Sequence, residues 1–214
     1  MTTSSKHNNK QIKALQARYQ HLTARECRNP RLAIKAVFSE NDMPEERQRL
    51  EEWLQCAFSA QRLSEVQMVF IPKLHFNLLR LLDAAALLAK ANDWHELNGP
   101  YVFEAHEPCW YFKRQHIDQV TACYYPRYLP LEQFINPYRV INACGLGLPS
   151  TRWKALLSAM LTAANSGKTI HDISPDKHAY GHCHALLQLL EAGYLVYVRE
   201  TQKPAEIGKG YTYK

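Results

Sequence analysis

The chain has 214 residues, enough for one large domain or two smaller ones with a sizeable buried core. Its apolar content of 46% and charged content of 21% are ordinary for a soluble globular protein, and it contains no internal repeat or low-complexity tract. The net charge of +6 is modest, so where the charges lie matters more than their sum.

The two ends of the chain are basic and the middle is acidic. Residues 1–40 carry eight Lys or Arg and two Asp or Glu, whereas residues 41–112 carry six and eleven. This asymmetry favours a polyanionic partner that the ends would contact. The alternative is an ordinary solvated surface.

Neither a secretory segment nor a membrane span is expected. The polar N-terminus lacks the apolar core of a signal peptide, and the most apolar run, Leu74–Ala91, is interrupted by polar residues. We therefore expect a cytoplasmic protein with free thiols rather than a disulfide framework. The six cysteines contain no CxxC pair and are Cys27, Cys56, Cys109, Cys123, Cys144 and Cys183.

Residues 1–9 are expected to be disordered, and a helix is expected from Lys10 to the Asn29-Pro30 break. Its apolar stripe consists of Ile12, Leu15, Tyr19 and Leu22. Away from that stripe lies a basic face, a possible second DNA contact or simply a solvated surface, formed by Lys10, Lys13, Arg18, Arg25 and Arg28.

Three more helices are expected in the N-terminal part. The first covers Arg31–Phe38, and the second runs from Met43, after a candidate N-cap at Asp42, to about Ser59. The third, Leu74–Ala91, is apolar nearly all round, so we expect it at the centre of the core or in a dimer interface.

The following stretch, 94–149, is rich in aromatics, Pro and Gly. Its candidate strands are Tyr101–Glu104, Trp110–Lys113 and Val120–Tyr125, and 142–149 looks like a linker. We expect residues 10–149 to form one mostly helical domain for dimerisation or partner contact.

Residues 150–214 predict helix, short helix, helix and β-hairpin. A helix capped by Ser150 or Thr151 carries the apolar stripe Trp153, Leu156, Leu157, Met160, Leu161 and Ala164 and ends at Asn165–Gly167. Lys168–Ile173 is the second element. The third runs from Ser174-Pro175-Asp176 to Ala192-Gly193, and the strands of the hairpin are Tyr194–Arg199 and Lys209–Lys214.

This order is that of a winged helix-turn-helix domain. The phrase LLQLLEAGYLVYVRE, at 186–200, resembles the end of the recognition helix and the first wing strand of bacterial winged-helix regulators. The predicted fold class is therefore mainly α with small β content: a helical N-terminal region followed by a C-terminal winged helix. The resemblance implies that the third helix enters the DNA major groove and that the hairpin lies along the backbone.

On such a helix, Gly181 is a small residue at the centre of the face opposite the apolar stripe. Gln188 can form hydrogen bonds to an adenine edge, and lysines can contact phosphates. The predicted DNA-binding residues are Lys177, His178, Gly181, His182, His184, Gln188, Lys203 and Lys209.

Three other chemistries are weighed and set aside. His178 and His182 are spaced i, i+4 and could share an ion, but a structural zinc usually needs four ligands. Ser166–Thr169 reads SGKT, yet Thr162 stands where a phosphate loop needs its first glycine. A cysteine with a histidine base is conceivable in the cluster His106, Cys109, His116 and Asp118, which carries no family signature.

We therefore predict a non-enzymatic protein without metal or cofactor that binds double-stranded DNA, as a homodimer and not at a membrane. This DNA binding could serve transcription regulation or the replication or maintenance of a mobile element, and the sequence does not separate these roles. The alternative is a scaffold whose winged helix contacts other proteins.

Overall fold

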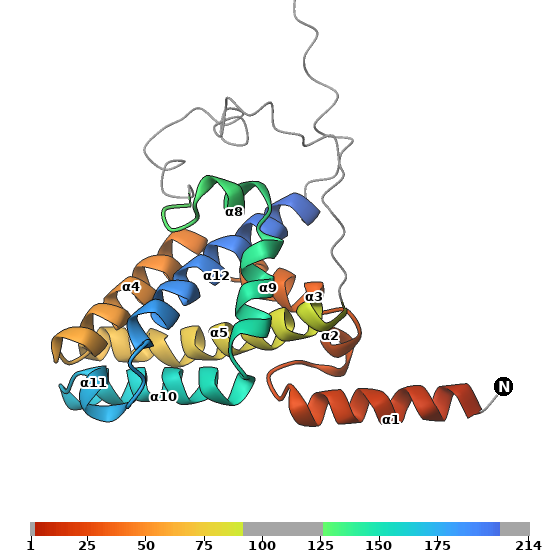
Figure 1. Ribbon diagram of the computed structural model, residues 1–214, viewed down its shortest axis with the longest axis horizontal. Coiled ribbons are helices and arrows are strands. Elements are labelled where there is room, and N and C mark those ends of the chain that lie inside the picture. The colour runs from red at the N-terminus through yellow and green to blue at the C-terminus, as the bar shows by residue number, and fades with distance from the viewer. Residues whose placement is uncertain (1–2, 92–125, 202–214) are drawn as a thin grey trace, which may run out of the picture.

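The computed structural model describes residues 3–91 and 126–201, and all regular secondary structure in those two ranges is helical (Figure 1). The long helices α5 and α12 form the centre, and each contacts α3, α4 and α9. The described helices are α1 (Thr3–Arg18), α2 (Ala24–Arg28), α3 (Arg31–Ser39), α4 (Met43–Ser59), α5 (Glu65–Ala91), α8 (Leu131–Ile135), α9 (Tyr138–Gly147), α10 (Ser150–Ser166), α11 (Ile170–Ile173) and α12 (Ala179–Thr201).

The N-terminal region is helical as expected, but its first helix is differently bounded. It begins at Thr3 rather than Lys10 and ends at Arg18, because Thr23 and Glu26 form a capping box that starts α2 as a separate helix. The Thr23 Oγ1 accepts from the Glu26 backbone N–H at 3.3 Å, and the Glu26 carboxylate accepts from the Thr23 N–H at 2.8 Å. The predicted helices at Arg31 and Met43 are confirmed.

Helix α5 begins nine residues before the predicted start at Leu74 and continues through Pro72. Ser64 and Gln67 start it by exchanging hydrogen bonds: the Ser64 Oγ accepts from the Gln67 N–H at 3.3 Å, and the Gln67 Oε1 accepts from the Ser64 N–H at 2.9 Å. Pro72 is exposed, so its ring is accommodated on the solvent side. The prediction covered only the most apolar run and so missed the part of α5 before Leu74, most of which is exposed.

Three polar residues that interrupt the apolar run of α5 each bond to another element. This arrangement satisfies buried polar groups while joining the central helix to its surroundings. Asn77 donates to Glu46 of α4, Arg80 pairs with Glu26 of α2, and Asp83 accepts from Ser150 of α10 and lies 2.8 Å from the His21 Nδ1.

Residues 142–149, predicted to be a linker, lie mostly in α9. Their small side chains permit a close crossing with α5. A Cβ atom at Gly145 would lie 2.4 Å from the Ala85 carbonyl oxygen, a distance that no real side chain tolerates. The neighbouring Ile141 and Cys144 are buried. The small residues therefore mark a helix contact and not a flexible joint.

The prediction of small β content with a C-terminal winged helix is wrong, because residues 194–201 continue α12 instead of forming a wing strand. Gly193 does not stop the helix. It is buried inside it, where a Cβ atom would come within 3.0 Å of the Phe38 ring. A helix buried on most sides lacks a polar face, so its apolar run cannot be told from a strand by periodicity. The predicted strand Lys209–Lys214 and those within 101–125 lie outside the described residues.

One hydrophobic core includes residues from both sides of Pro149. Trp53 and Leu78, from α4 and α5, lie in it with Leu157 of α10 and Leu190 of α12. Beside this core is a buried ion pair, in which the Arg47 Nη1 lies 2.8 Å from the Glu191 Oε1. The helices after Pro149 thus pack into the same interior as those before it, so the predicted domain boundary at 150 coincides with no break in the core.

Burial of His75 makes the stability of the fold sensitive to pH. The His75 ring lies 6.1 Å from the Trp53 ring, and its Nε2 has no hydrogen-bond partner among the described residues. Burial, with nearby His21, lowers the pKa of His75 below its usual value. The unfolded chain then binds the proton first as pH falls, so the stability contributed by neutral His75 is complete above about pH 6.5 and lost below it.

We expect the free energy of unfolding to fall less from about pH 7 to about pH 5 in His75→Gln than in the natural protein. Urea unfolding of both proteins at both pH values measures the difference. An equal fall in both would contradict the assignment.

Candidate functional site

The predicted DNA-reading residues lie at the start of α12 but do not form one open face. Lys177, His178, Gly181 and His184 are exposed, whereas His182 and Gln188 are half-buried. The Gln188 Nε2 donates to the Tyr128 carbonyl oxygen at 3.1 Å, so the chain before α8 covers the middle of the helix. Lys203 and Lys209 lie outside the described residues. A helix covered at Gln188 cannot enter a groove along its length.

The histidines near the start of α12 are organised by a carboxylate. The His182 Nδ1 lies 3.0 Å from the Asp176 Oδ2, and the His182 ring meets the Trp153 ring edge-on at 5.9 Å. The His178 backbone N–H donates to the same carboxylate and, with His182, lowers the pKa of Asp176. Within the described residues, no group of three or more His, Cys, Asp or Glu side chains is placed to hold a metal ion.

The described cysteines are buried free thiols, which confirms that part of the prediction: Cys27, Cys56, Cys144 and Cys183. Burial raises the pKa of the Cys144 and Cys183 thiols to about 12, so neither is a thiolate at neutral pH. The cluster around Cys109 lies outside the described residues.

An aromatic hollow lies between α4 and α12, and we name it the α4–α12 hollow. It has a volume of about 300 Å³. The Tyr128 and His184 rings meet edge-on with centroids 5.7 Å apart, and the Phe58 and Tyr180 rings do the same at 5.7 Å. Its lining residues are Glu51, Leu54, Gln55, Phe58, Tyr128, Tyr180, Cys183, His184 and Leu187.

A carboxylate completes this hollow. The Tyr128 hydroxyl donates to the Glu51 Oε1 at 2.7 Å. Burial and this hydrogen bond raise the pKa of Tyr128 to about 12, so the phenol stays neutral at neutral pH. The described lining residues include no lysine or arginine.

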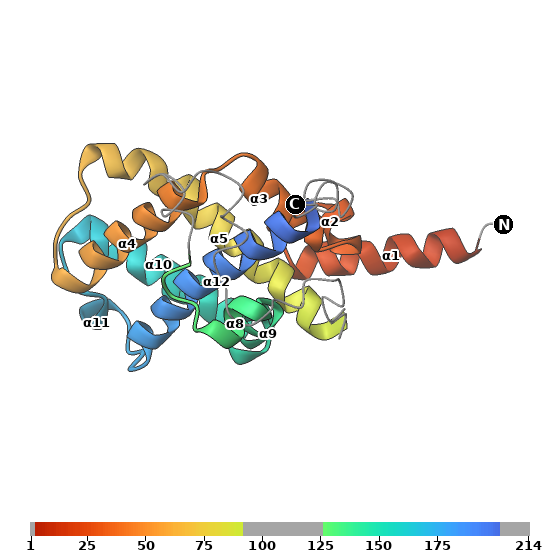
Figure 2. The same ribbon diagram turned by 90° about the horizontal axis from the view of Figure 1, so that it is seen from above.

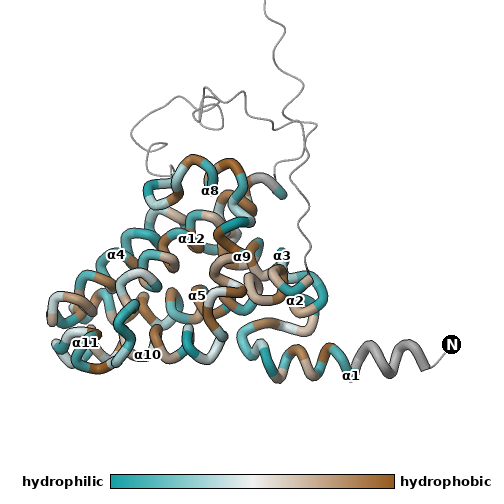
Figure 3. The backbone as a smooth tube through the Cα atoms, in the orientation of Figure 1, coloured by the Kyte–Doolittle hydropathy of each residue, from teal (hydrophilic) through white to brown (hydrophobic). Residues whose placement is uncertain are grey.

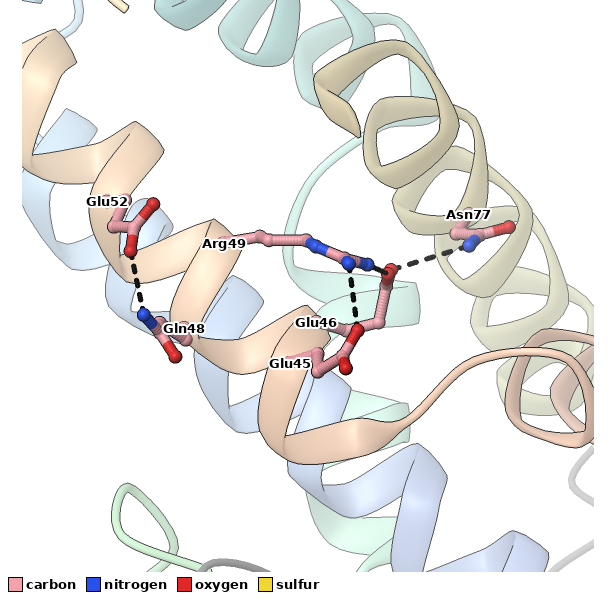
Figure 4. Close-up of polar contacts among 6 residues, drawn as sticks. All are labelled: Glu45, Glu46, Gln48, Arg49, Glu52 and Asn77. Carbon is pink, nitrogen blue, oxygen red and sulfur yellow. Dashed lines mark hydrogen bonds and ion pairs between the residues drawn. The ribbon is translucent and has the colours of Figure 1, made fainter. Parts of the chain in front are cut away.

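A second hollow lies between α4 and the start of α5 and has a volume of about 320 Å³. Its lining contains both carboxylates and a guanidinium, so its charges offset each other. The Arg49 guanidinium lies 4.5 Å from the centre of the Phe70 ring and donates to both Glu45 and Glu46 at 2.8 Å (Figure 4). Gln48 donates to Glu52 at 2.9 Å. The chain thus supplies its own cation to this aromatic and acidic surface.

The opposite end of the molecule is basic. Helix α1 projects from the helical body, with α2 and α3 beside its base (Figures 1 and 2). Polar and apolar residues alternate along the described part of α1 (Figure 3), which matches the predicted stripe. We call the following exposed cations the basic end: Lys10, Lys13, Arg18, Arg25, Arg28 and Lys35.

Acidic side chains scarcely offset the basic end. Between residues 10 and 40 the acids are Glu26, which is buried and paired with Arg80, and Glu40. Helix α1 is held at its C-terminal end by Tyr19, which is buried and whose hydroxyl accepts a hydrogen bond from the Lys90 Nζ at 2.9 Å.

The chain matches no family model, no curated protein and no solved structure. In the described ranges, no helix combines the length and apolarity that a membrane crossing requires.

Sequence reasoning found the basic face and His184 but missed Phe58, Tyr128 and Tyr180. Tyr180 and His184 are four residues apart on α12 and so share one side of that helix. Phe58 and Tyr128 come from other elements, and no local spacing connects them to α12.

Proposed function

We propose that the protein is a non-enzymatic DNA-binding protein that holds duplex phosphates with the basic end rather than reading bases along α12. The observation that carries this proposal is the set of six exposed cations on α1–α3, with Glu40 the one exposed acid between residues 10 and 40. Lysine and arginine neutralise phosphates and release counterions, which favours binding without a sequence requirement.

The placement of α1 supports the same function. Ile12 of α1 and Tyr19, which directly follows this helix, are buried, whereas Lys10 and Lys13 of α1 are exposed. A projecting basic helix presents its charges without bringing the acidic α4 close to the phosphates. The two uses proposed for DNA binding, transcription regulation and maintenance of a mobile element, remain predictions, as does the homodimer.

We expect the triple variant Lys10→Glu/Lys13→Glu/Arg18→Glu to lose most of its affinity for a random-sequence duplex. The salt dependence should also become shallower, by roughly 0.9 in log–log slope for each phosphate contact removed. Fluorescence anisotropy over a series of salt concentrations measures both quantities with the full-length protein.

A matched control reverses three exposed cations elsewhere: Lys73→Glu/Arg152→Glu/Lys168→Glu gives the same change in net charge. It should weaken binding far less, as should Lys177→Ala on the predicted reading helix. If both triple variants lose affinity equally, only net charge matters and the basic end is not the site. Absence of binding by the natural protein at low salt would refute DNA binding itself.

A further inference from the structure

We propose that the α4–α12 hollow is a recognition site for a cationic side chain, lysine or arginine, presented by a partner protein. This site is separate from the basic end and does not depend on DNA binding. The proposal rests on four observations: the aromatic walls, the carboxylate, the charge imbalance of the lining, and the exposure of one wall.

The walls have the chemistry that attracts a cation. Phe58, Tyr128 and Tyr180 present aromatic rings, and the face of such a ring is negative and attracts an ammonium or guanidinium group within about 6 Å. Leu54 and Leu187 add an apolar surface that suits the methylene stem of a long basic side chain.

Glu51 supplies the opposite charge. The Tyr128 hydroxyl donates to one of its oxygens, the Oε1, which orients the carboxylate at the wall of the hollow. An ion pair beside aromatic faces is partly shielded from water, so it is stronger than the same pair in free solution.

The two hollows beside α4 differ in whether a lysine or arginine of the chain lines them. In the hollow between α4 and α5, Arg49 of the chain itself already covers the Phe70 ring and pairs with Glu45 and Glu46 (Figure 4). The α4–α12 hollow has the same combination of rings and carboxylate but no lysine or arginine among its described lining residues. Within the described residues, the nearest guanidinium acting on Tyr128 is that of Arg47, which pairs with Glu191 and does not line the hollow, so the hollow has room for a cation from a partner.

The openness of one wall indicates a protein side chain rather than a free small molecule. Tyr180 remains 71% exposed, so a small cation in the hollow would stay partly in water. Small-molecule sites usually enclose about 70–90% of their ligand. A lysine or arginine carried on a partner's surface would have its exposed side covered by that surface.

Peptides that differ at one residue test the proposal. Four capped pentapeptides carry lysine, arginine, trimethyllysine or norleucine between glycines, and norleucine keeps the lysine stem without its charge. Titration into full-length protein, followed by NMR signals of the tyrosine rings, should show binding by the three cationic peptides and none by norleucine. Free n-butylammonium, the lysine side chain without a peptide, should bind more weakly than the lysine peptide.

Variants locate the site. Tyr180→Ala and Glu51→Gln should each weaken binding of the lysine peptide by about two- to fivefold, while Tyr180→Phe keeps the ring and should retain it. Phe76→Ala removes an exposed aromatic on α5 outside the hollow and should change nothing. Because Tyr180 is exposed, its replacement leaves the core intact.

Four outcomes would overturn the proposal. If norleucine binds as well as lysine, the hollow is merely apolar. If n-butylammonium binds as tightly as the lysine peptide, the ligand is a free organic cation and not a protein side chain. If no ring signal of Tyr128 or Tyr180 moves at millimolar peptide, or if Tyr180→Ala leaves the affinity unchanged, the hollow is not the site.

Discussion

Replacing Gly145 with alanine is expected to destabilise the protein by about 2–3 kcal/mol, although alanine favours helices. The new Cβ would lie 2.4 Å from the carbonyl oxygen of Ala85 and 2.7 Å from its carbonyl carbon, both of them backbone atoms of α5. No side-chain rotation relieves such a contact, so α5 and α9 must move apart and lose packing. The melting temperature should fall by roughly 5–10 °C, as measured by circular dichroism.

Gly147, in the same helix, provides the matched control. A Cβ atom there meets nothing within 4 Å, and the residue is exposed. Gly147→Ala should leave stability unchanged or raise it by up to about 1 kcal/mol, because alanine restricts the unfolded chain. If the two variants have equal stability, the close crossing of α5 and α9 is not formed.

Glu191→Gln is expected to cost more, about 3–5 kcal/mol, because it breaks a buried ion pair by removing the charge of one member. The side chain of Glu191 is fully buried and that of Arg47 is 2% exposed. The carboxylate accepts from the Arg47 Nη1 and from the backbone N–H groups of Arg127 and Tyr128, each at 2.8 Å. A glutamine amide supplies one acceptor oxygen where the site needs two.

This loss should appear in the midpoint of urea unfolding and should be absent from Glu132→Gln. Glu132 pairs with Arg139 at 3.4 Å with both side chains largely exposed, so its charge contributes less than about 1 kcal/mol. The double variant Arg47→Met/Glu191→Gln should be less destabilised than the sum of the single variants, because the two side chains contact each other and their effects are coupled. A loss for Glu191→Gln as small as that for Glu132→Gln would refute the buried pair.

Much of the N-terminal fold could be predicted because its signals are local. Asn29-Pro30 and Asp42-Met43-Pro44 mark boundaries that the structure keeps. The same is true of Gly167 in the C-terminal part, which ends α10 in the left-handed conformation that glycine favours. These motifs act within one or two helical turns. They therefore have the same effect whatever surrounds them.

The C-terminal prediction failed where the signal depended on distant residues. Gly193 followed by Tyr194–Val198 resembles a helix stop and a strand when only neighbours are considered. In the fold, Phe38 approaches Gly193, and Leu195 and Val196 are buried in the interior. Burial on most sides removes the polar alternation from which helices are recognised.

The two candidate sites also differ in whether the sequence alone indicates them. The basic face of α1 follows from charge and helical spacing, so the sequence indicates it directly. The α4–α12 hollow combines Phe58, Tyr128 and Tyr180 from three segments far apart in the chain. No spacing rule relates these residues, because tertiary packing alone brings them together.

The sequence by itself determined the helices within 10–59 and 74–91, the basic N-terminal end, the acidic α4 and the free state of the four described thiols. Periodicity, capping and charge are properties of neighbouring residues and are present before folding. Only the tertiary structure decided that α12 continues through Gly193, that Tyr128 covers Gln188, and that Glu51 faces a set of aromatic rings. Each of these depends on contacts between segments separated by more than fifty residues, which local patterns do not encode.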